Sequence, residues 1–337
     1  MRATISDVAS EAGVSIKTVS RVLNNERYVR EDTRARVSAA VAALDYQPSL
    51  AARSLGGRRS FQIGVVYDNP NPYYAHELQG GIRARAAAEG VRLIAQPYDR
   101  GAPGLAAQIG ALINATQVDG LILTPPVTDR RDVLDLLQAR NVRIVRVQPG
   151  TEIDRSPATA IDNVAAAHAM TTRLIELGHR RIGFVAGPTD YAVSAERERG
   201  FGLAMAEAGL TAPPDLVRRG DFGFGSGMAA AVDLIPAGAT AIFAASDAMA
   251  AGVLAEGHRR GLSLPRDLSV VGFDDSALAS SVWPPLTTVR QPLHDLGWHA
   301  ADLLLGKGEA EALRLLPFEI VERGSTARPG AAGEPST

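Results

Sequence analysis

Beyond residue 60 the sequence alternates between short apolar runs and longer amphipathic stretches, and this alternation constrains the fold more than any other feature. The apolar runs have the length of strands, and most of the stretches between them have the length and periodicity of helices. Repeated strand–helix units indicate parallel sheets covered by helices on both faces. Ten candidate strands are too many for one lobe, so the sequence predicts two similar doubly wound lobes. These strands are 61–67, 91–98, 119–126, 142–148, 158–163, 181–187, 240–246, 268–275, 286–291 and 316–321.

The first 60 residues lack this alternation, and their apolar residues recur at helical spacing. The sequence predicts a first helix that begins with a capping box at Thr4 and Asp7 and ends at Gly13, a second helix at Ile16–Leu23 capped by Ser15, and a third from about Glu31 to Leu44. Two short helices joined by a tight glycine turn, with a third that completes the core, are typical of a helix-turn-helix module.

The charge is divided unevenly between these two regions. Residues 1–60 carry ten Lys/Arg and six Asp/Glu, a net charge of +4, whereas the whole chain has a net charge of −2. A basic helical region joined to an acidic body indicates a module that binds a polyanion such as DNA. Chance would explain an excess of four charges equally well, so this inference needs the support of a motif.

The sequence excludes several classes of protein. It contains no cysteine, which excludes disulfides, cysteine-ligated zinc and a thiol nucleophile. The stretch MRATISDVAS does not resemble a signal peptide, and no apolar run approaches the roughly 18 residues of a membrane span. We therefore expect a soluble, cytoplasmic protein with no membrane partner.

Motifs of enzymes are also missing. The sequence has no GxxxxGK[ST], HExxH or GxSxG motif. The glycines of 222–227 follow no clear strand and therefore fail the dinucleotide-binding fingerprint, and the six histidines are too scattered to share a metal. We expect no enzymatic activity, no cofactor and no metal.

Three long stretches resemble one family, the LacI/GalR transcription regulators. They are TISDVASEAGVSIKTVSRVLNN (4–25), YQPSLAARSL (46–55) and DLSVVGFDDSALASSVWPPLTTVRQP (267–292). The first is similar to the DNA-reading headpiece of the family, the second to its hinge and the third to its C-terminal signature. They occur in the family's order and at its spacing, and the resemblance extends over essentially residues 3–328.

The resemblance implies a domain arrangement. It predicts a helix-turn-helix DNA-binding domain at 1–47, a hinge helix and linker at 48–60, and an effector-binding and dimerisation domain at 61–328. This last domain would consist of two Rossmann-like lobes similar to periplasmic sugar-binding proteins, between which the chain passes three times. By this analogy lobe one is about 61–161 and 293–320, lobe two is about 162–292 and 321–328, and 329–337 is a disordered tail.

In a helix-turn-helix the second helix enters the major groove with its N-terminal residues against the base edges. Those residues here are Ser15, Ile16, Lys17 and Thr18, with Arg21 one turn later. Lys17 can donate to guanine and Ile16 can contact a thymine methyl group, and the family places its specificity positions at these two residues. The alternative for Lys17 is an ordinary solvated lysine. Contacts to phosphates are expected from Thr4, Ser6, Asn24, Asn25 and Tyr28.

The hinge would form a second DNA-binding element. In the family, paired hinge helices fold on the operator and wedge a leucine into the minor groove, which bends the duplex. The resemblance assigns the wedge to Leu55, places Ala52 towards the partner hinge and places Arg53 near the DNA backbone. The family's usual cap of the third helix is replaced by Arg30, which cannot cap through its side chain, so the start of that helix is left open.

Ligands of open α/β sheets bind beyond the carboxyl ends of the strands, so polar and aromatic residues at those ends are candidates for the effector site. Carboxylates, amides and an arginine around an aromatic face suit a sugar, since its hydroxyls need donors and acceptors and its ring needs a flat apolar partner. The family resemblance implies effector contacts for Arg197, Phe222 and Asp274. The candidates are Asn69, Tyr73, Tyr74, Asp162, Arg197, Phe222, Asp247, Asp274 and Gln291.

These candidates have structural alternatives. An aspartate at a strand–helix junction commonly caps the helix, and for Asp247 capping is at least as well supported as ligand contact. Tyr73 and Tyr74 could equally pack between the lobes, and Asn69, Asp162 and Gln291 are even choices.

The sequence as a whole predicts a homodimeric transcriptional repressor. A helix-turn-helix headpiece would bind a palindromic operator in double-stranded DNA, and a sugar bound between the lobes would change their angle and thereby the affinity for the operator. A purine or another small metabolite is the alternative effector. A sugar-binding protein without a DNA role is the alternative function.

Overall fold

The computed structural model describes residues 3–23, 26, 28–46, 59–68, 71–98, 104–211, 213–306 and 311–330. The chain forms two compact units, Met1–Phe61 and Gln62–Thr337. Several predictions lie outside the described residues, namely those for Asn24, Asn25, Ala52, Arg53, Leu55 and Asn69, for most of the hinge and for most of the tail.

The described residues of the first unit form three helices, α1 (Ile5–Glu11), α2 (Ile16–Leu23) and α3 (Glu31–Ala43). The predicted capping box is confirmed, since the Thr4 hydroxyl accepts from the Asp7 amide and the Asp7 carboxylate accepts from the Thr4 amide. Helix α3 begins at Glu31 without a side-chain cap from Arg30. Two acids in its first turn, Glu31 and Asp32, face the positive end of the helix dipole instead.

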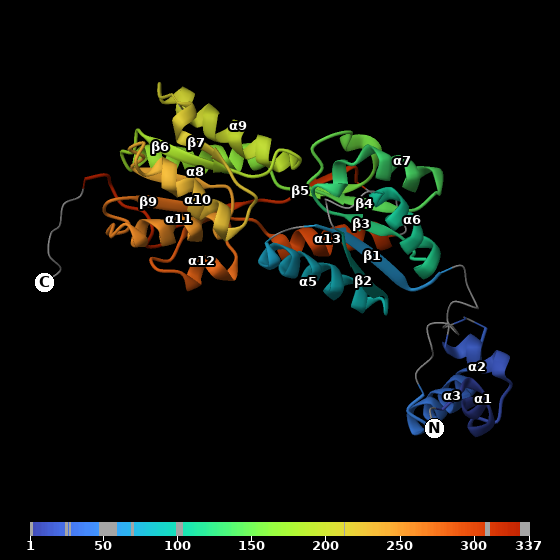
Figure 1. Ribbon diagram of the computed structural model, residues 1–337. Coiled ribbons are helices and arrows are strands. Elements are labelled where there is room, and N and C mark those ends of the chain that lie inside the picture. The colour runs from blue at the N-terminus through green and yellow to red at the C-terminus, as the bar shows by residue number, and fades with distance from the viewer. Residues whose placement is uncertain are drawn as a thin grey trace, which may run out of the picture. The chain divides into compact units, whose positions relative to one another are not determined.

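The second unit contains two six-stranded sheets (Figure 1). The strand order of the first is β11-β5-β4-β3-β1-β2, and all its strands are parallel. Its strands are β1 (Gln62–Tyr67), β2 (Arg92–Pro97), β3 (Leu121–Leu123), β4 (Ile144–Val147), β5 (Ala158–Ala160) and β11 (Leu313–Leu315). Four helices pack around it, α5 (Pro72–Ala88), α6 (Leu105–Thr116), α7 (Arg131–Ala139) and α13 (Leu293–Leu305). We call this sheet with its helices lobe one.

The second sheet has the order β12-β10-β9-β8-β6-β7, with only β12 antiparallel to its neighbour. Its strands are β6 (Ile182–Ala186), β7 (Val217–Arg219), β8 (Ala241–Ala244), β9 (Ser269–Asp274), β10 (Thr287–Arg290) and β12 (Glu319–Val321). Its helices are α8 (Asn163–Glu176), α9 (Ala192–Glu207), α10 (Phe224–Leu234), α11 (Asp247–Arg259) and α12 (Ala277–Ser281). We call this assembly lobe two.

The chain passes between the lobes after β5, after β10 and again between β11 and β12. Helix α13 therefore lies beside α5 although more than 200 residues separate them in the sequence (Figure 1). In the core of lobe one, Val66 and Leu123 of the sheet pack with Ile109 of α6 and Leu137 of α7. The two-lobed doubly wound fold is confirmed, while the exact lobe boundaries stay a prediction.

Two details of the sequence prediction are wrong. The strand predicted at 316–321 is shorter, since only Glu319–Val321 forms β12, and β11 (Leu313–Leu315) precedes the predicted range and is absent from the prediction. The two strands belong to different sheets, so the chain crosses between the lobes from one to the other. Strand β7 is absent from the prediction because its sequence, Val-Arg-Arg, is short and polar. Since β7 leads towards the glycines of 222–227, the stated reason for rejecting a dinucleotide fingerprint there does not hold. No helix in the described ranges is long and apolar enough to cross a membrane.

Candidate functional site

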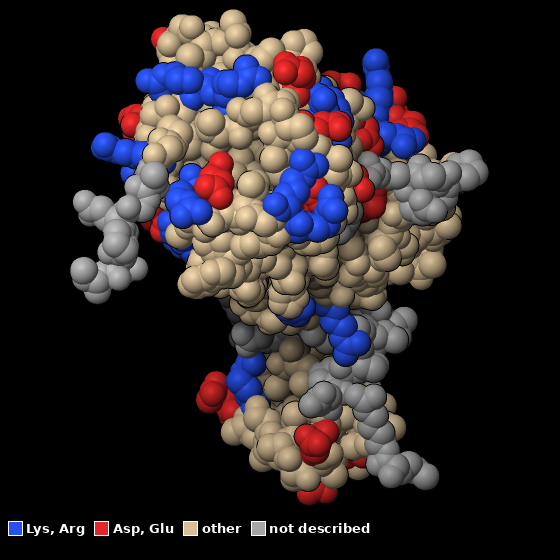
Figure 2. Space-filling view, turned by 60° about the vertical axis from the view of Figure 1, so that its left-hand side comes forward, with Lys and Arg blue, Asp and Glu red and all other residues tan. Residues whose placement is uncertain are grey.

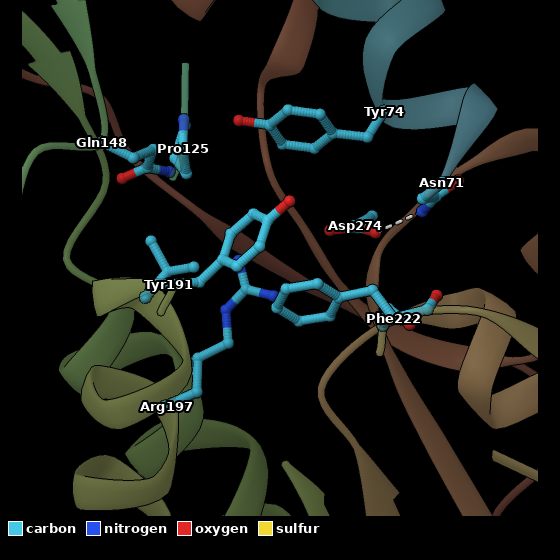
Figure 3. Close-up of a pocket in the computed structure, with 10 residues that line it drawn as sticks. Asn71, Tyr74, Pro125, Gln148, Tyr191, Arg197, Phe222 and Asp274 are labelled. Atoms are coloured by element: carbon cyan, nitrogen blue, oxygen red, sulfur yellow. Dashed lines mark hydrogen bonds between the residues drawn. The ribbon is translucent and has the colours of Figure 1, made fainter. Parts of the chain in front are cut away.

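A pocket lies where the carboxyl ends of strands from both sheets meet, as expected for doubly wound folds. It encloses about 370 Å³ of empty space, part of which is open to solvent. Figure 3 shows its aromatic, amide and charged side chains converging from the two lobes. The lining residues are Asn71, Tyr74, Pro125, Gln148, Tyr191, Val193, Arg197, Phe222, Ser246 and Asp274.

Asp274 ends strand β9 and is 5% exposed. Its two carboxylate oxygens accept from Gln291 Nε2 at 2.7 Å and from Asn71 Nδ2 at 3.0 Å. Burial raises the pKa of Asp274 to about 6, against the opposing effect of Arg197 and of these two hydrogen bonds. Its φ of 119° lies in a region that strains a residue with a side chain, and such strain concentrates at functional positions.

Arg197 on α9 supplies the positive charge of the pocket and is 4% exposed. Its Nε donates to Asn163 Oδ1 at 3.0 Å, and its Nη1 donates to the carbonyl oxygen of Ala245 at 2.7 Å. The guanidinium also stacks on Phe273, with Cζ 3.6 Å from the ring centroid. Burial lowers the pKa of Arg197, and the nearby Asp274 opposes this effect.

Three aromatic side chains wall the pocket, Tyr74, Tyr191 and Phe222 (Figure 3). The rings of Tyr191 and Phe222 meet edge to face, with centroids 5.2 Å apart. Phe222 fits because Gly187 lies beneath it, where a Cβ would stand 2.2 Å from the ring. Burial, followed by the charge of Asp274, raises the pKa of Tyr74 above its ordinary range, so this phenol remains neutral.

Asp247 is fully buried but does not line the pocket. Its carboxylate accepts from the Ser276 amide at 2.7 Å and from Thr288 Oγ1 at 2.6 Å, so it anchors the turn that follows Asp274. Burial and the charge of Asp274 raise the pKa of Asp247 to about 8. Helix α11 is capped by Ser246, whose hydroxyl accepts from the Met249 amide at 3.1 Å.

The predicted effector residues therefore divide into groups. Four of them, Tyr74, Arg197, Phe222 and Asp274, line the pocket, and Gln291 lies behind Asp274. Three others do not line this pocket. Asp162 is exposed and caps α8 through the Ala165 amide at 2.8 Å, Tyr73 is 39% exposed on α5, and Asp247 is the buried anchor described above.

The sequence prediction missed Asn71, Pro125, Gln148, Tyr191, Val193 and Ser246. Two of these carry a signal that could have been used. Asn71 precedes Pro72 at the start of α5 and caps it, which is a recognisable helix start. Gln148 directly follows β4, where the rule applied to the other strands would have found it.

The candidate DNA-reading residues of the first unit lie on and around α2. Ile16 is 50% exposed, Lys17 and Arg21 are exposed, and Tyr28 is 99% exposed. Thr4 and Ser6 are exposed at the start of α1. The Ser15 hydroxyl accepts from the Thr18 amide at 3.2 Å and so caps α2, as predicted. Val19 and Val22 are buried, which leaves the exposed side of α2 to the polar residues and Ile16.

Figure 2 shows charged side chains of both signs on one face of the larger unit. Lys/Arg and Asp/Glu side chains are interspersed there rather than gathered by sign. Charged side chains of this unit also form ion pairs, as Arg218 does with Asp233 and Arg219 with Glu198. Such a mixed surface does not attract a polyanion.

Comparison with known proteins agrees with this architecture. Residues 4–49 match the family described as bacterial regulatory proteins, lacI family, and residues 171–326 match a periplasmic binding protein-like domain. The ribose operon repressor of Escherichia coli (strain K12) is 34% identical over 96% of this chain and 99% of its own length. The chain belongs to the lacI family of bacterial regulatory proteins.

Solved structures of lacI-family proteins share the whole fold. A lac repressor dimer bound to operator and the anti-inducer ONPF has 30% identity and a TM-score of 0.81, covering 97% of this chain and 100% of that chain. The transcriptional regulator CelR in complex with cellobiose has 31% identity and a TM-score of 0.73, covering 96% and 100%. The resemblance found in the sequence is confirmed. This lacI-family chain is a DNA-binding transcriptional regulator and not an enzyme.

Proposed function

We propose that this chain is a cytoplasmic, homodimeric repressor whose affinity for a palindromic operator is controlled by an uncharged sugar bound in the pocket between the lobes. The observation that carries the proposal is the pocket itself. It combines aromatic walls with convergent amide, hydroxyl and carboxylate groups at the carboxyl ends of the strands of both lobes.

The lining suits a sugar in its chemistry. Asp274, Asn71, Gln148 and Ser246 offer donors and acceptors for hydroxyl groups, and the aromatic walls offer flat apolar surfaces for a ring. The related CelR structure holds cellobiose, a neutral sugar. Among the described lining residues, the charged ones are Asp274 and Arg197, whose charges are opposite and balance. An anionic effector would find no unbalanced cation here, which favours an uncharged ligand.

The proposed reading surface is the exposed side of α2. Lys17 and Ile16 would contact base edges in the major groove, and Arg21 would contact a base or a phosphate. The Arg21 guanidinium lies 3.5 Å from Glu26 in an exposed pair, which DNA phosphates would displace at small cost. Roles for Ala52, Arg53 and Leu55 in the hinge stay predictions.

The mechanism is a shift between two lobe arrangements. A ligand changes such an equilibrium only through its differential affinity for the two states, and this coupling is typically about 1–3 kcal/mol. The pocket gives the sugar different affinities for the two lobe arrangements. Its walls belong to both lobes, so a sugar that contacts both at once binds one arrangement better than the other.

A genomic selection tests the proposal. Purified full-length chain is used to enrich fragments of sheared genomic DNA, with and without a panel of D-ribose, cellobiose, adenine and guanine, and Lys17→Glu serves as the matched control. We expect the unmodified chain alone to recover a palindrome, and a sugar to change that recovery. Equal enrichment by both chains would contradict the reading surface, and a response to a purine alone would contradict the sugar.

A further inference from the structure

A chain of four buried hydrogen bonds connects the two charged residues of the pocket. Arg197 Nε donates to Asn163 Oδ1 at 3.0 Å, and Asn163 Nδ2 donates to Gln148 Oε1 at 3.2 Å. Gln148 Nε2 donates to Gln291 Oε1 at 3.0 Å, and Gln291 Nε2 donates to Asp274 Oδ1 at 2.7 Å. Each of these five residues is at most 5% exposed.

All four hydrogen bonds run in the same direction. A guanidinium can only donate and a carboxylate can only accept, so the two ends fix the orientation of every amide between them. Turning one amide around would place donor against donor or acceptor against acceptor. Buried groups without partners are costly, and such a fully satisfied network therefore has a single arrangement.

The chain of hydrogen bonds runs from lobe two to lobe one and back to lobe two. Asp274 and Arg197 belong to lobe two, and Gln148 follows β4 of lobe one. Gln291 and Asn163 stand on two of the segments that cross between the lobes, after β10 and after β5. Gln148 also accepts from the Ile161 amide at 3.2 Å, so its carboxamide holds both crossing segments.

Asn163, like Gln291, takes part in this hydrogen-bond chain without lining the pocket. Its Oδ1 holds Arg197, and its Nδ2 donates to Gln148 and also to Glu196 Oε2 at 3.0 Å. Arg197 and Gln148 are pocket residues of opposite lobes. Asn163 therefore connects a wall of lobe two with a wall of lobe one through its side-chain hydrogen bonds.

We propose that Asn163 is a positioning residue that holds lobe one against lobe two through this hydrogen-bond chain. Its regulatory meaning rests on the proposed function, since an effector that takes over one link releases the lobes from this position. A sugar hydroxyl placed between Gln148 and Asp274 can both donate and accept, so it can replace a link of the chain.

The substitution Asn163→Asp tests the proposal because the two side chains have nearly the same shape. A carboxylate still accepts from Arg197 but cannot donate to Gln148 or Glu196. At neutral pH the series of hydrogen bonds is therefore interrupted at this position. Protonation of the introduced carboxylate would restore one donor. The charged groups that face this position are Glu196 and Arg197 of α9, with Asp162 beside it on α8, and Arg199 and Asp129 near Glu196.

The readout is the distance between spin labels on the two lobes, measured by pulsed electron resonance on the full chain. The sequence has no cysteine, so Arg131→Cys on lobe one and Leu203→Cys on lobe two give unique labelling sites. Both native side chains are exposed, at 81% and 45%. An excess of unlabelled chain ensures one labelled copy per assembly. Asp162→Asn is the matched control, since Asp162 is the neighbouring residue and lies outside the hydrogen-bond chain.

We expect the distance distribution of Asn163→Asp to differ from that of the unmodified chain at pH 7 and to match that of the unmodified chain when both are measured at about pH 5. Asp274, whose pKa is raised to about 6, titrates over the same range in both chains, so each comparison is made at a single pH. Asp162→Asn should match the unmodified chain at both pH values. An unchanged distribution for Asn163→Asp at pH 7, or a change that acidification leaves in place, would overturn the proposal.

A second variant keeps the test valid if Asn163→Asp does not fold, as judged by circular dichroism. Gln148→Met breaks the same hydrogen-bond chain with an apolar side chain of similar length, and a distribution like that of the unmodified chain would overturn the proposal. The measurement uses neither sugar nor DNA. A failure of the proposed function would therefore appear only in the genomic selection and would be distinguishable from a failure here.

Discussion

The hydroxyl of Tyr191 in lobe two donates a hydrogen bond of 2.5 Å to the backbone carbonyl of Asp68 in lobe one. This bond joins the lobes at the pocket, which Tyr191 lines. Tyr191 therefore forms part of the aromatic wall of the pocket and also connects the two lobes through a hydrogen bond.

Replacing Tyr191 by phenylalanine should remove this bond and keep the ring contact with Phe222. We expect a loss of about 1 kcal/mol in the free energy of unfolding, the usual net value of one such hydrogen bond. Urea unfolding followed by circular dichroism measures the change. Tyr73→Phe is the control, since Tyr73 is partly exposed and lies outside the pocket; a similar loss in both variants would remove the special role of Tyr191.

The lobes also touch through two small residues, Gly150 and Ala192. A Cβ at Gly150 would stand 2.0 Å from the Cβ of Ala192, far inside any permitted contact. Gly150→Ala should destabilise the unit by about 1–3 kcal/mol through overpacking. The double variant Gly150→Ala/Ala192→Gly should recover most of this loss, since it moves the methyl group to the other lobe.

Gly202, on the same helix as Ala192, provides the control for this pair. A Cβ at Gly202 meets nothing within 4 Å, and Gly202→Ala should stabilise α9 by about 0.5–1 kcal/mol. Thermal and urea unfolding of the four proteins give the comparison. If the double variant is no more stable than Gly150→Ala alone, a clash between the lobes is not the cause of the destabilisation by Gly150→Ala.

His179 gives the stability of lobe two a dependence on pH. It is 1% exposed and bonds Thr240, Ser269 and the carbonyl oxygen of Ala327, and burial lowers its pKa from the ordinary 6.5. The unfolded chain therefore binds the proton more readily, so this contribution is fully present above about pH 6.5 and is lost as the pH falls through the folded pKa.

The raised pKa values of Asp274 and Asp247 have the opposite effect on stability. The folded protein holds protons on these two carboxyls more readily than the unfolded chain does, so their contribution to stability increases as the pH falls. The contribution of His179 must be measured by difference. We expect His179→Gln to lower the free energy of unfolding by about 2 kcal/mol at pH 7 and by less at pH 5. A cost that is equal at both pH values would contradict a neutral, buried His179.

Asp274→Ala should remove the binding of whichever sugar of the D-ribose and cellobiose panel stabilises the unmodified chain. Loss of a buried acceptor that holds a hydroxyl should lower the affinity at least tenfold, about 1.4 kcal/mol. Asp162→Asn should leave the affinity unchanged, because Asp162 caps α8 away from the pocket. Isothermal titration calorimetry compares the three chains, and equal affinity for Asp274→Ala would exclude Asp274 from the site.

The sequence predicts best the features that depend on neighbouring residues. The capping box of Thr4 and Asp7 and the cap of Ser15 involve groups within three residues, and both are present as predicted. The buried strands β6, β8 and β9 are continuous apolar runs and are predicted for that reason. Strand β7 has no such run, since two of its three residues are arginines, and it is defined by pairing with β6.

The pocket depends on contacts that sequence spacing does not reveal. Asp247 and Asp274 both lie near the carboxyl ends of strands of lobe two, and the sequence separates them only by the helix expected after Asp247 and by the family resemblance that implies an effector contact for Asp274. The structure separates them because Ser276 and Thr288 occupy the carboxylate of Asp247, whereas Asp274 meets Asn71 from the other lobe. The position of Gln148 directly after β4 could have marked it as a pocket residue, but its role in joining the lobes depends on partners 13 to 143 residues away.

The three passages of the chain between the lobes determine how truncation or proteolysis can separate the lobes. Neither lobe is a continuous stretch of sequence, so neither could be expressed alone from a simple truncation. A protease that cut the segment after β5 would leave the lobes covalently joined by the segment after β10 and the one between β11 and β12. Separating them requires three cuts, which makes a single nick in this region a change of flexibility and not a loss of half the molecule.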